Sequence, residues 1–423
     1  MSKNDMPYRL SEIESNQGIR FSHPGATPGH HCPMHTALAS IRNIKGLSSL
    51  VIGMPECSFY SRYVMERPVL QNGELHYTYV LDSNEVVFGC RQGVLDALEE
   101  MQQDGAKAIV MIMTCIPALI GEDIAETAET FSADNETKAV CIDLAHYRRN
   151  GYEAGFYETY ASLLQVTGRK KGISRQVAVL GPSKGTEADE LKQWLREDSY
   201  EVLEIEAAFA LEDFAKVPDS TLNIVTHIHF LSFARKLEEL YQVPFVFLGE
   251  AYGVGELKQC YKDIQTILQL SREPDFAFLS LAEPLEQAIK QQYKNSRFIV
   301  NGGIEDVLLL TKYLTSLTMI PCLLHVEEYQ VWMKKWKEEI VKNGGNPLVT
   351  YIVRREIKEE VLEEAGFLSR DDFRFSIGFN TGRGEAVIPA QRSFLPSVLG
   401  FQRTYELLER LKQLWKESRH AAL

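Results

Sequence analysis

Short β-rich apolar runs alternate with amphipathic helical stretches along almost the whole chain, and this alternation constrains the fold more than any other feature. Continuous apolar runs are typical of strands buried on both faces of a parallel sheet, and the helical stretches supply the crossovers. The pattern predicts an α/β protein of two to three Rossmann-like, doubly wound domains with mostly parallel sheets. We expect strands at 50–53, 108–113, 139–142, 177–180, 222–225, 245–248, 298–300 and 348–352, and helices at 91–103, 186–196, 232–241, 326–341 and 400–416.

The length of the chain predicts more than one domain. Its 423 residues, of which 45% are hydrophobic, exceed what one compact core usually organises. Polar stretches at 167–175 and 291–296 each precede a new expected strand. We therefore expect an N-terminal domain over 1–170, a central Rossmann-like domain over 171–292 and a C-terminal Rossmann-like domain over 293–423.

Charge and patterning exclude several classes of partner. The formal net charge of −13 argues against nucleic acid and against anionic membrane surfaces, which select basic patches. The longest apolar run, 108–120, contains Pro117 and is too short to span a bilayer. The first twenty residues lack the apolar segment of an export signal, so we expect a cytoplasmic protein with reduced thiols.

Two glycine-rich turns follow expected strands, at 181–185 and 301–303. A turn that leads from a strand into a helix is where phosphate sites form. Neither turn matches the P-loop or the G-x-G-x-x-G pattern. We therefore interpret both as ordinary strand-to-helix turns and do not expect this chain to hydrolyse ATP.

Three cysteines in the first third of the chain are the strongest candidates for a metal site: Cys32, Cys57 and Cys115. They are too widely spaced for a zinc finger or ribbon, so only a folded sheet can bring them together. Cys57 and Cys115 each follow the carboxyl end of an expected buried strand, where open α/β sheets place their sites. Because Cys-only ligation is typical of iron–sulfur clusters, we interpret the three as cluster ligands.

The other four cysteines have simpler interpretations. Cys141 and Cys322 lie inside apolar runs and Cys260 lies in an apparent helix. Free cysteine often behaves as a small buried hydrophobe, so we expect core or incidental roles for these three. Cys90 begins another helix near the candidate ligands, and its role stays open.

Zinc is the main chemical alternative to iron. His35 follows Cys32 at a C-x-x-H spacing, and together with the two later cysteines it would complete a tetrahedral Cys₃His site. His30 and His31 offer further nitrogens. His227 and His229 follow the strand expected at 222–225, either as ligands or as residues satisfied by hydrogen bonds.

An amphipathic helix is expected directly after Cys115. Pro117 is favoured near the start of a helix, and Glu122 and Asp123 lie early, where the helix dipole favours anions. The inward face of this helix is expected to carry Leu119, Ile120, Ile124, Ala125, Ala128 and Phe131.

These segments resemble the nitrogenase component 1 family. The third cluster-cysteine motif of its subunits is similar to residues 114–124, TCIPALIGEDI, and the second resembles residues 53–62, GMPECSFYSR. Cys32 with the following proline and helix resembles the first motif. The run VVFG at 86–89 and the run LEELYQVP at 237–244 are also similar to segments of the family.

The resemblance implies a subunit of a two-component reductase. In that family, three cysteines from each of two homologous subunits hold an iron–sulfur cluster at their interface, and a separate ATP-dependent iron–sulfur reductase delivers electrons. Carried over, Cys32, Cys57 and Cys115 would ligate a 4Fe–4S or P-cluster-like 8Fe–7S cluster that passes electrons to a substrate. Members of the same family also act as scaffolds on which a metal cofactor is assembled, which is the alternative function.

Two departures from the family pattern limit which kind of family member the resemblance implies. Glu56 stands where the family usually has glycine before the second cysteine, and its role stays open. The chain has no cysteine between Cys141 and Cys260, where a catalytic nitrogenase subunit supplies a thiolate to its substrate cofactor. The resemblance therefore implies a nitrogenase-like paralogue or a non-catalytic partner subunit. Its substrate is left open among tetrapyrrole rings, small sulfur compounds and nitrogenase substrates.

Overall fold

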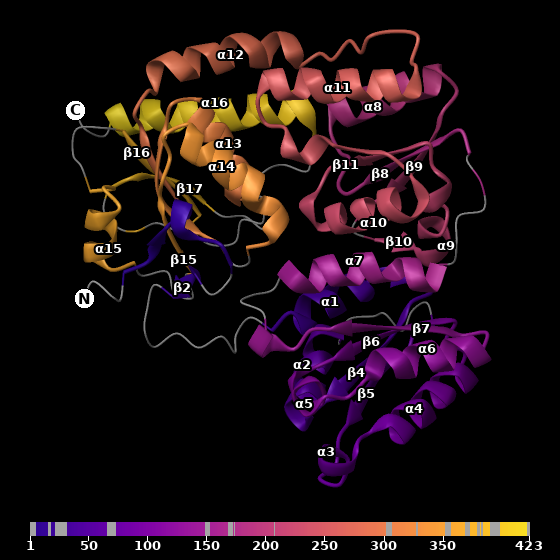
Figure 1. Ribbon diagram of the computed structural model, residues 1–423. Helices are drawn as coiled ribbons and strands as arrows, with labels where there is room; N and C mark the ends of the chain where they lie inside the picture. The colour runs from indigo at the N-terminus through magenta and orange to yellow at the C-terminus, as the bar shows by residue number, and fades with distance from the viewer. Residues whose placement is uncertain are drawn as a thin grey trace. The chain divides into compact units, whose positions relative to one another are not determined.

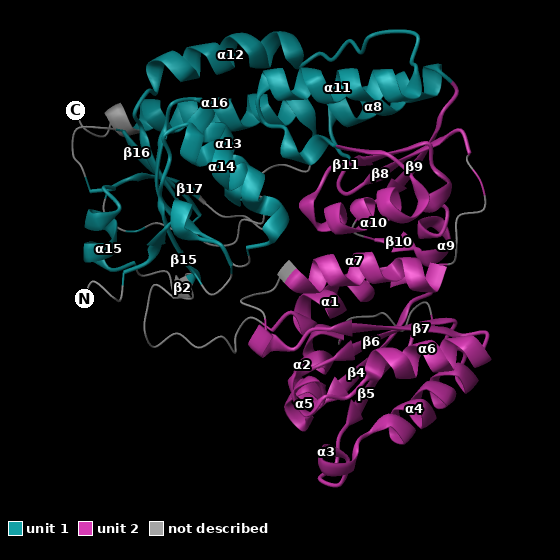
Figure 2. Cartoon of the chain, viewed as in Figure 1, with its two compact units in different colours: residues 1–27, 183–198, 247–423 teal, residues 28–182, 199–246 magenta. Residues whose placement is uncertain are grey.

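The computed structural model shows two compact α/β units, each formed from separate stretches of the chain (Figure 2). Unit 1 comprises residues 1–27, 183–198 and 247–423, and unit 2 comprises 28–182 and 199–246. The predicted division into three domains at residues 170 and 292 stays a prediction. The described residues are 6–15, 18–21, 32–65, 73–148, 153–167, 172, 174–206, 208–301, 307–326, 329–351, 357–368, 373–378, 381, 384–389 and 398–420.

The first sheet of unit 2 is a four-stranded parallel sheet in the order β5-β4-β6-β7. The chain enters at β4, adds β5 on one side and then crosses to β6 on the other. The topological switch point of this doubly wound sheet therefore lies between β4 and β6, where such sheets bind their ligands. The strands are β4 (Ser48–Gly53), β5 (His76–Val80), β6 (Ala108–Met113) and β7 (Lys138–Asp143).

Helices cover both faces of this sheet (Figure 1). Leu50 and Ile109 share a buried core with apolar side chains of α4 and α6 on one face. Helices α1 and α7 pack against each other and against strands of the same sheet. The helices of this part are α1 (Met34–Ile41), α2 (Pro55–Met65), α3 (Glu85–Phe88), α4 (Arg91–Gln103), α5 (Cys115–Ile120), α6 (Ile124–Asp134) and α7 (Glu153–Thr167), with a 3-10 turn at His146–Arg148.

A second four-stranded sheet has the order β12-β11-β8-β9, and β8 runs parallel to both β11 and β9. Its switch point lies between β8 and β11. The strands are β8 (Gln176–Leu180), β9 (Glu201–Ile205), β11 (Leu222–Val225) and β12 (Phe245–Phe247), beside the short pair β3 (Ile44–Lys45) and β10 (Phe209–Ala210). The helical elements are α9 (Leu211–Phe214), α10 (Leu231–Tyr241) and 3-10 turns at Val217–Asp219 and Ile228–Phe230.

Unit 1 contains a seven-stranded sheet in the order β1-β15-β14-β13-β16-β17, with β2 also beside β15. Among the described strands of this sheet, only the pair β1–β15 is antiparallel. The strands are β1 (Tyr8–Arg9), β2 (Arg20–Phe21), β13 (Arg297–Asn301), β14 (Ile320–His325), β15 (Leu348–Tyr351), β16 (Arg374–Gly378) and β17 (Ala386–Pro389).

The last helix, α16, packs against α8, α11 and α12 within unit 1. The helices are α8 (Thr186–Glu197), α11 (Val254–Leu268), α12 (Leu279–Gln292), α13 (Val307–Ser316), α14 (Lys334–Lys342), α15 (Glu359–Glu364) and α16 (Gly400–His420), with 3-10 turns at Leu10–Glu12, Leu248–Glu250 and Val331–Met333.

The structure confirms the predicted α/β class with mostly parallel sheets. Each expected strand is present within two residues of its predicted ends. The helix expected at 326–341 is wrong over its first part, because Gln330 is extended and a 3-10 turn precedes α14. Of the glycine-rich turn expected at 301–303, Gly302 and Gly303 lie outside the described residues. No helix in the described part of the chain combines the length and apolar composition needed to cross a bilayer.

Candidate functional site

The pairing of β4 with β6 brings Cys57 and Cys115 to one place. The parallel register ends at Ile52 on β4, and Thr114 directly after β6 donates its backbone N–H to the Ile52 carbonyl at 3.1 Å. Cys115 is then the first residue of α5, while Cys57 lies in the first turn of α2. Both cysteines therefore stand at the carboxyl edge of the sheet, at its topological switch point.

A direct contact links the two motifs. The Cys57 thiol donates to Thr114 Oγ1 across 3.5 Å, and that hydroxyl donates to the Ile52 carbonyl at 2.8 Å. Gly53 passes close by: a Cβ added there would lie 2.2 Å from Thr114 Oγ1 and 3.0 Å from Cys57 Sγ. Only glycine leaves room for this contact.

Cys32 precedes α1, and its carbonyl accepts the backbone N–H of His35 at 3.1 Å. Burial raises the pKa of the Cys32 thiol to about 12, and negative charge on Cys115 and Cys57 raises it too, against a backbone hydrogen bond from Met34 that lowers it. Cys32 is therefore close enough to Cys115 and Cys57 for their charge to bear on its thiol. A bound cation would offset this repulsion and favour the Cys32 thiolate.

The donor set fits an iron–sulfur cluster, because such clusters are held by cysteine thiolates. Cys32, Cys57 and Cys115 are all half-buried in this part of unit 2. Across the described residues, no group of three or more His, Cys, Asp or Glu side chains is arranged so that it could hold a single metal ion. Glu56 is exposed in the first turn of α2.

Cys90 is engaged by carboxylates. It is buried at the start of α4, and its backbone N–H donates to Glu122 Oε1 at 3.2 Å. Burial raises the pKa of the Cys90 thiol to about 12, and the charges of Glu122 and then Glu85 add to the effect. The neutral thiol is therefore favoured here.

The remaining cysteines lie in other elements of the chain. Cys322 is buried in the core of unit 1, and Cys141 packs against the core of the first sheet of unit 2. Cys260 lies in α11, as expected from the sequence. Burial raises the pKa of Cys141 and Cys260 to about 12 and that of Cys322 to about 11.

The helix predicted after Cys115 is two helices. Helix α5 ends at Ile120, because Gly121 adopts a left-handed conformation with φ of +84°. Helix α6 then begins afresh, since the Asp123 side chain accepts the Glu126 backbone N–H at 2.9 Å and caps it. The expectation that Leu119, Ile120 and Ala125 face inward is wrong: Leu119 is 67% exposed, and Ile120 and Ala125 are exposed as well.

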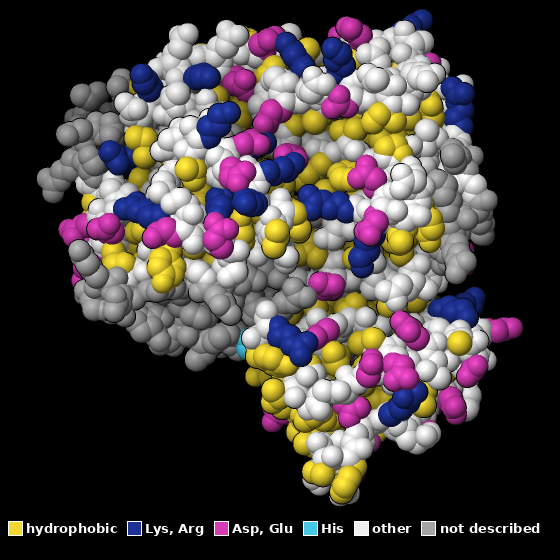
Figure 3. Space-filling model, in the orientation of Figure 1, with side chains coloured by type: hydrophobic (Ala, Val, Ile, Leu, Met, Phe, Trp, Pro, Cys, Tyr) yellow, Lys and Arg dark blue, Asp and Glu magenta, His cyan; other side chains and the backbone are white. Residues whose placement is uncertain are grey.

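Three short helical segments beside the cysteines expose large apolar side chains. Phe88 at the end of α3 is 84% exposed. Figure 3 shows apolar side chains gathered in this region of unit 2, including the projecting tip that α3 forms. We call the set the apolar patch: Phe59, Tyr60 and Tyr63 on α2, Val87 and Phe88 on α3, and Leu119 and Ile120 on α5.

The histidines considered as zinc ligands occupy other environments. The His35 ring contacts the Tyr60 ring edge-on at 5.9 Å, and burial lowers its pKa. His229 is buried and stacks on Phe156 with ring centroids 3.9 Å apart, while His227 Nδ1 accepts the His229 backbone N–H at 3.4 Å. His30 and His31 lie outside the described residues.

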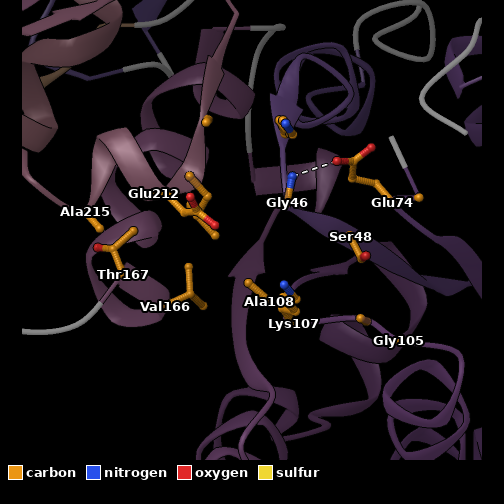
Figure 4. Close-up of a pocket in the computed structure, with 15 residues that line it drawn as sticks. Gly46, Ser48, Glu74, Gly105, Lys107, Ala108, Val166, Thr167, Glu212 and Ala215 are labelled. Carbon is orange, nitrogen blue, oxygen red and sulfur yellow. Dashed lines mark hydrogen bonds between the residues drawn. The ribbon is translucent and has the colours of Figure 1, made fainter. Parts of the chain in front are cut away.

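A cavity of about 410 Å³ opens at the opposite edge of the same sheet (Figure 4). It lies where β4 and β6 begin, and its lining includes Lys45, Lys107 and Glu212. Glu74 is buried there and accepts the Gly46 backbone N–H at 2.7 Å. The cavity has no cysteine in its lining. No sequence motif marks it, because its lining comes from separate stretches of the chain at 45–48, 73–74, 105–108, 166–167 and 210–215.

Comparison with known proteins places this chain in a family. The sequence model described as nitrogenase component 1 type oxidoreductase matches residues 32–373, a stretch that contains all three candidate ligands. One subunit of the light-independent protochlorophyllide reductase of Crocosphaera subtropica (strain ATCC 51142 / BH68) is 26% identical over 208 residues, which are 45% of this chain and 40% of that protein. The corresponding protein of Synechocystis sp. (strain ATCC 27184 / PCC 6803 / Kazusa) is 24% identical over 57% of this chain and 50% of that protein.

The matched part of the chain thus spans half or less of these curated relatives. The fold extends further than the sequence similarity. The solved structure "Nitrogenase Cp1 at pH 6.5" superposes with a TM-score of 0.64 at 14% identity, covering 91% of this chain and 92% of that chain. This protein belongs to the nitrogenase component 1 type oxidoreductase family.

Proposed function

We propose that the chain is one subunit of a two-component reductase in which Cys32, Cys57 and Cys115 ligate an iron–sulfur cluster. The observation that carries the proposal is the β4–β6 register, which places Cys57 beside the residue preceding Cys115 at the switch point of the sheet. The electrostatic influence of both on Cys32 supports a shared site. A cluster of the 4Fe–4S or P-cluster-like 8Fe–7S type would supply one-electron chemistry there.

The chain itself contributes rigid ligand placement. Cys115 follows a strand whose residues are almost all buried, and its helix begins at once after that strand. Cys57 is fixed through its bond to Thr114, which is itself tied to Ile52. Ligands that directly follow the ends of buried strands need to move little when the cluster changes its oxidation state. Such preorganised ligands favour electron transfer over loss of the metal.

The apolar patch supports a protein partner at the cysteine edge. Contiguous exposed apolar and aromatic side chains mark interaction surfaces in proteins. We propose that a homologous second subunit covers the patch and completes the cluster ligands. An ATP-dependent iron–sulfur reductase protein would deliver the electrons, in agreement with the absence of a P-loop from this sequence.

The relatives suggest the first substrate to test. Two of them are named for reduction of protochlorophyllide, a tetrapyrrole. We propose a tetrapyrrole ring as the substrate class. The lack of any cysteine between Cys141 and Cys260 supports a substrate bound without a thiolate-anchored metal cofactor.

The test is anaerobic purification with any co-eluting partner, followed by iron, sulfide and zinc analysis and by EPR before and after dithionite reduction. Alanine at Cys32, Cys57 or Cys115 should abolish or degrade the cluster signal. Cys141→Ala and Cys260→Ala are matched controls that should keep it, because Cys141 lies within strand β7 and Cys260 within helix α11 of the other unit.

Three outcomes would contradict the proposal. Full iron content and an unchanged spectrum in all three variants would remove the ligand assignment. Stoichiometric zinc in place of iron and sulfide would establish a structural metal site instead. Transfer of the cluster to an apo-protein, without turnover of protochlorophyllide or another substrate, would favour the assembly-scaffold function.

A further inference from the structure

The hydroxyl of Thr114 does not make the hydrogen bond that a threonine at the start of a helix usually makes. Thr114 is the N-cap residue of α5 and has the extended backbone of an N-cap. Threonine is favoured at N-caps because its oxygen accepts a backbone N–H from the first turn of the helix. Here the side chain makes no capping hydrogen bond. The hydroxyl is directed toward Cys57 and Ile52 instead.

The contacts of this hydroxyl allow it to exchange one hydrogen-bond partner for another. It donates to the Ile52 carbonyl at 2.8 Å, and the backbone N–H of Thr114 donates to the same carbonyl at 3.1 Å. If the hydroxyl turns away, the carbonyl keeps the backbone donor. Thr114 is 3% exposed, so water has little access to replace the hydroxyl.

Ligation changes what Cys57 needs from its neighbour. As a thiol, Cys57 donates to Thr114 Oγ1 across 3.5 Å. A cysteine that binds metal releases its proton to solvent, so its sulfur becomes an acceptor. Rotation of the Thr114 O–H about its C–O bond then supplies the donor that the sulfur lacks.

We propose that Thr114 is a positioning and potential-tuning residue, which turns its hydroxyl from the Ile52 carbonyl to the Cys57 sulfur when Cys57 ligates the cluster. This inference rests on the proposed function, because it requires Cys57 to be a ligand. Hydrogen bonds to the sulfurs of a cluster are one of the factors that set its reduction potential. The bond should stabilise the reduced state, which carries more negative charge, and so raise the potential.

Gly53 leaves the space in which the contact between Thr114 and Cys57 forms. A side chain at that position would occupy the space beside both Thr114 Oγ1 and Cys57 Sγ. The contact therefore depends on two features that are far apart in sequence, the glycine that ends β4 and the threonine that follows β6. Neither the first nor the third cysteine makes a hydroxyl contact of this kind among the hydrogen bonds of the described residues.

The experiment compares Thr114→Val, which has nearly the same shape without the hydroxyl, with Thr114→Ser, which keeps the hydroxyl. Each is purified anaerobically as the complex with its partner and titrated with EPR detection. At a fixed solution potential, T114V should lower the ratio of reduced to oxidised cluster about tenfold relative to wild type, which equals about 59 mV for a one-electron couple. T114S should stay within about twofold of wild type.

Electron–nuclear double resonance after exchange into ²H₂O gives a second, direct readout. A deuteron coupled to the cluster should be detected in wild type and in T114S and be absent from T114V. This signal reports the O–H···S bond itself, which a purely structural role of Thr114 would not produce.

Several results would overturn the inference. Equal potentials and equal deuteron couplings in all three proteins would show that the hydroxyl does not reach the sulfur. Equal changes in T114V, which lacks the hydroxyl, and T114S, which keeps it, would show that the effect comes from disturbed packing and not from the hydroxyl. If T114V loses the cluster, absence of the deuteron coupling from wild type and T114S refutes the bond, and its presence supports it. A wild-type complex without any cluster is a distinct outcome, since it refutes the proposed function as well.

Discussion

Replacement of Gly53 by alanine tests the packing at the cysteine edge without replacing a candidate ligand. The new Cβ would lie 2.2 Å from Thr114 Oγ1, whereas real Cβ atoms essentially never come within 3.0 Å of another heavy atom. The same Cβ would lie 3.0 Å from Cys57 Sγ. The hydroxyl cannot withdraw freely, because it is buried and bonded to the Ile52 carbonyl at 2.8 Å.

The cost follows from two effects. Forcing an extra methyl group into a well-packed site typically costs about 1–3 kcal/mol. Displacing the Thr114 hydroxyl leaves a buried polar group with poorer bonding, which adds about 1 kcal/mol or more. We therefore expect Gly53→Ala to lower the free energy of unfolding by about 2–4 kcal/mol. We also expect cluster content to fall, because Cys57 is bonded to the displaced hydroxyl.

The assay is urea unfolding of the metal-free chain together with iron analysis of the anaerobically purified complex. Gly172→Ala is the matched control in unit 2: a Cβ at Gly172 meets no atom within 4 Å, and its backbone N–H keeps its bond to Asp219 Oδ1. The control should leave both the urea midpoint and the iron content unchanged. A Gly53→Ala protein with wild-type midpoint and full iron content would refute the packing argument.

Three further predictions concern other parts of the chain. Burial raises the pKa of Glu187 to about 7. The stability that its protonation contributes is therefore present below about pH 4.5 and is lost as the pH rises through about 7. Glu187→Gln should flatten this fall in the melting temperature between pH 5 and pH 8. Phe88→Ser should leave the melting temperature unchanged and weaken partner binding in sedimentation experiments. Val331 is also strongly exposed but lies in unit 1, and Val331→Ser should leave partner binding unchanged. Lys312→Met should change urea stability measurably, by about 1 kcal/mol or more in either direction, because it removes a buried ammonium bonded to Glu256 at 2.8 Å.

The strands of the site could be predicted because of where they lie. Residues of β4 and β6 are almost all buried, so they form continuous apolar runs in the sequence. The positions of Cys57 and Cys115 after those strands then follow from counting residues. The proximity of Thr114 to Ile52 could not be predicted, because it depends on a register between strands that are 62 residues apart at this point.

Helical periodicity failed where the chain changes direction within a few residues. Leu119 and Ile120 continue the apolar spacing of α6, which suggested a single helix with one buried face. The left-handed Gly121 and the Asp123 cap separate α5 from α6, so the two apolar side chains turn outward. Apolar residues at helical spacing can therefore lie on the surface when a helix-ending glycine and a new helix cap stand between them.

The break between α5 and α6 also places exposed apolar side chains beside Cys115. Helix α5 has only six residues: it buries Pro117 and Ala118 but leaves Leu119 exposed, and it carries Cys115 at its first position. A proposed ligand and a proposed partner-binding residue thus share one short element. If a partner supplies the remaining cluster ligands, partner binding and cluster binding must be coupled by the same factor in both directions. Phe88→Ser should consequently lower cluster retention as well as subunit affinity, although its side chain lies on a separate helix and carries no ligand atom.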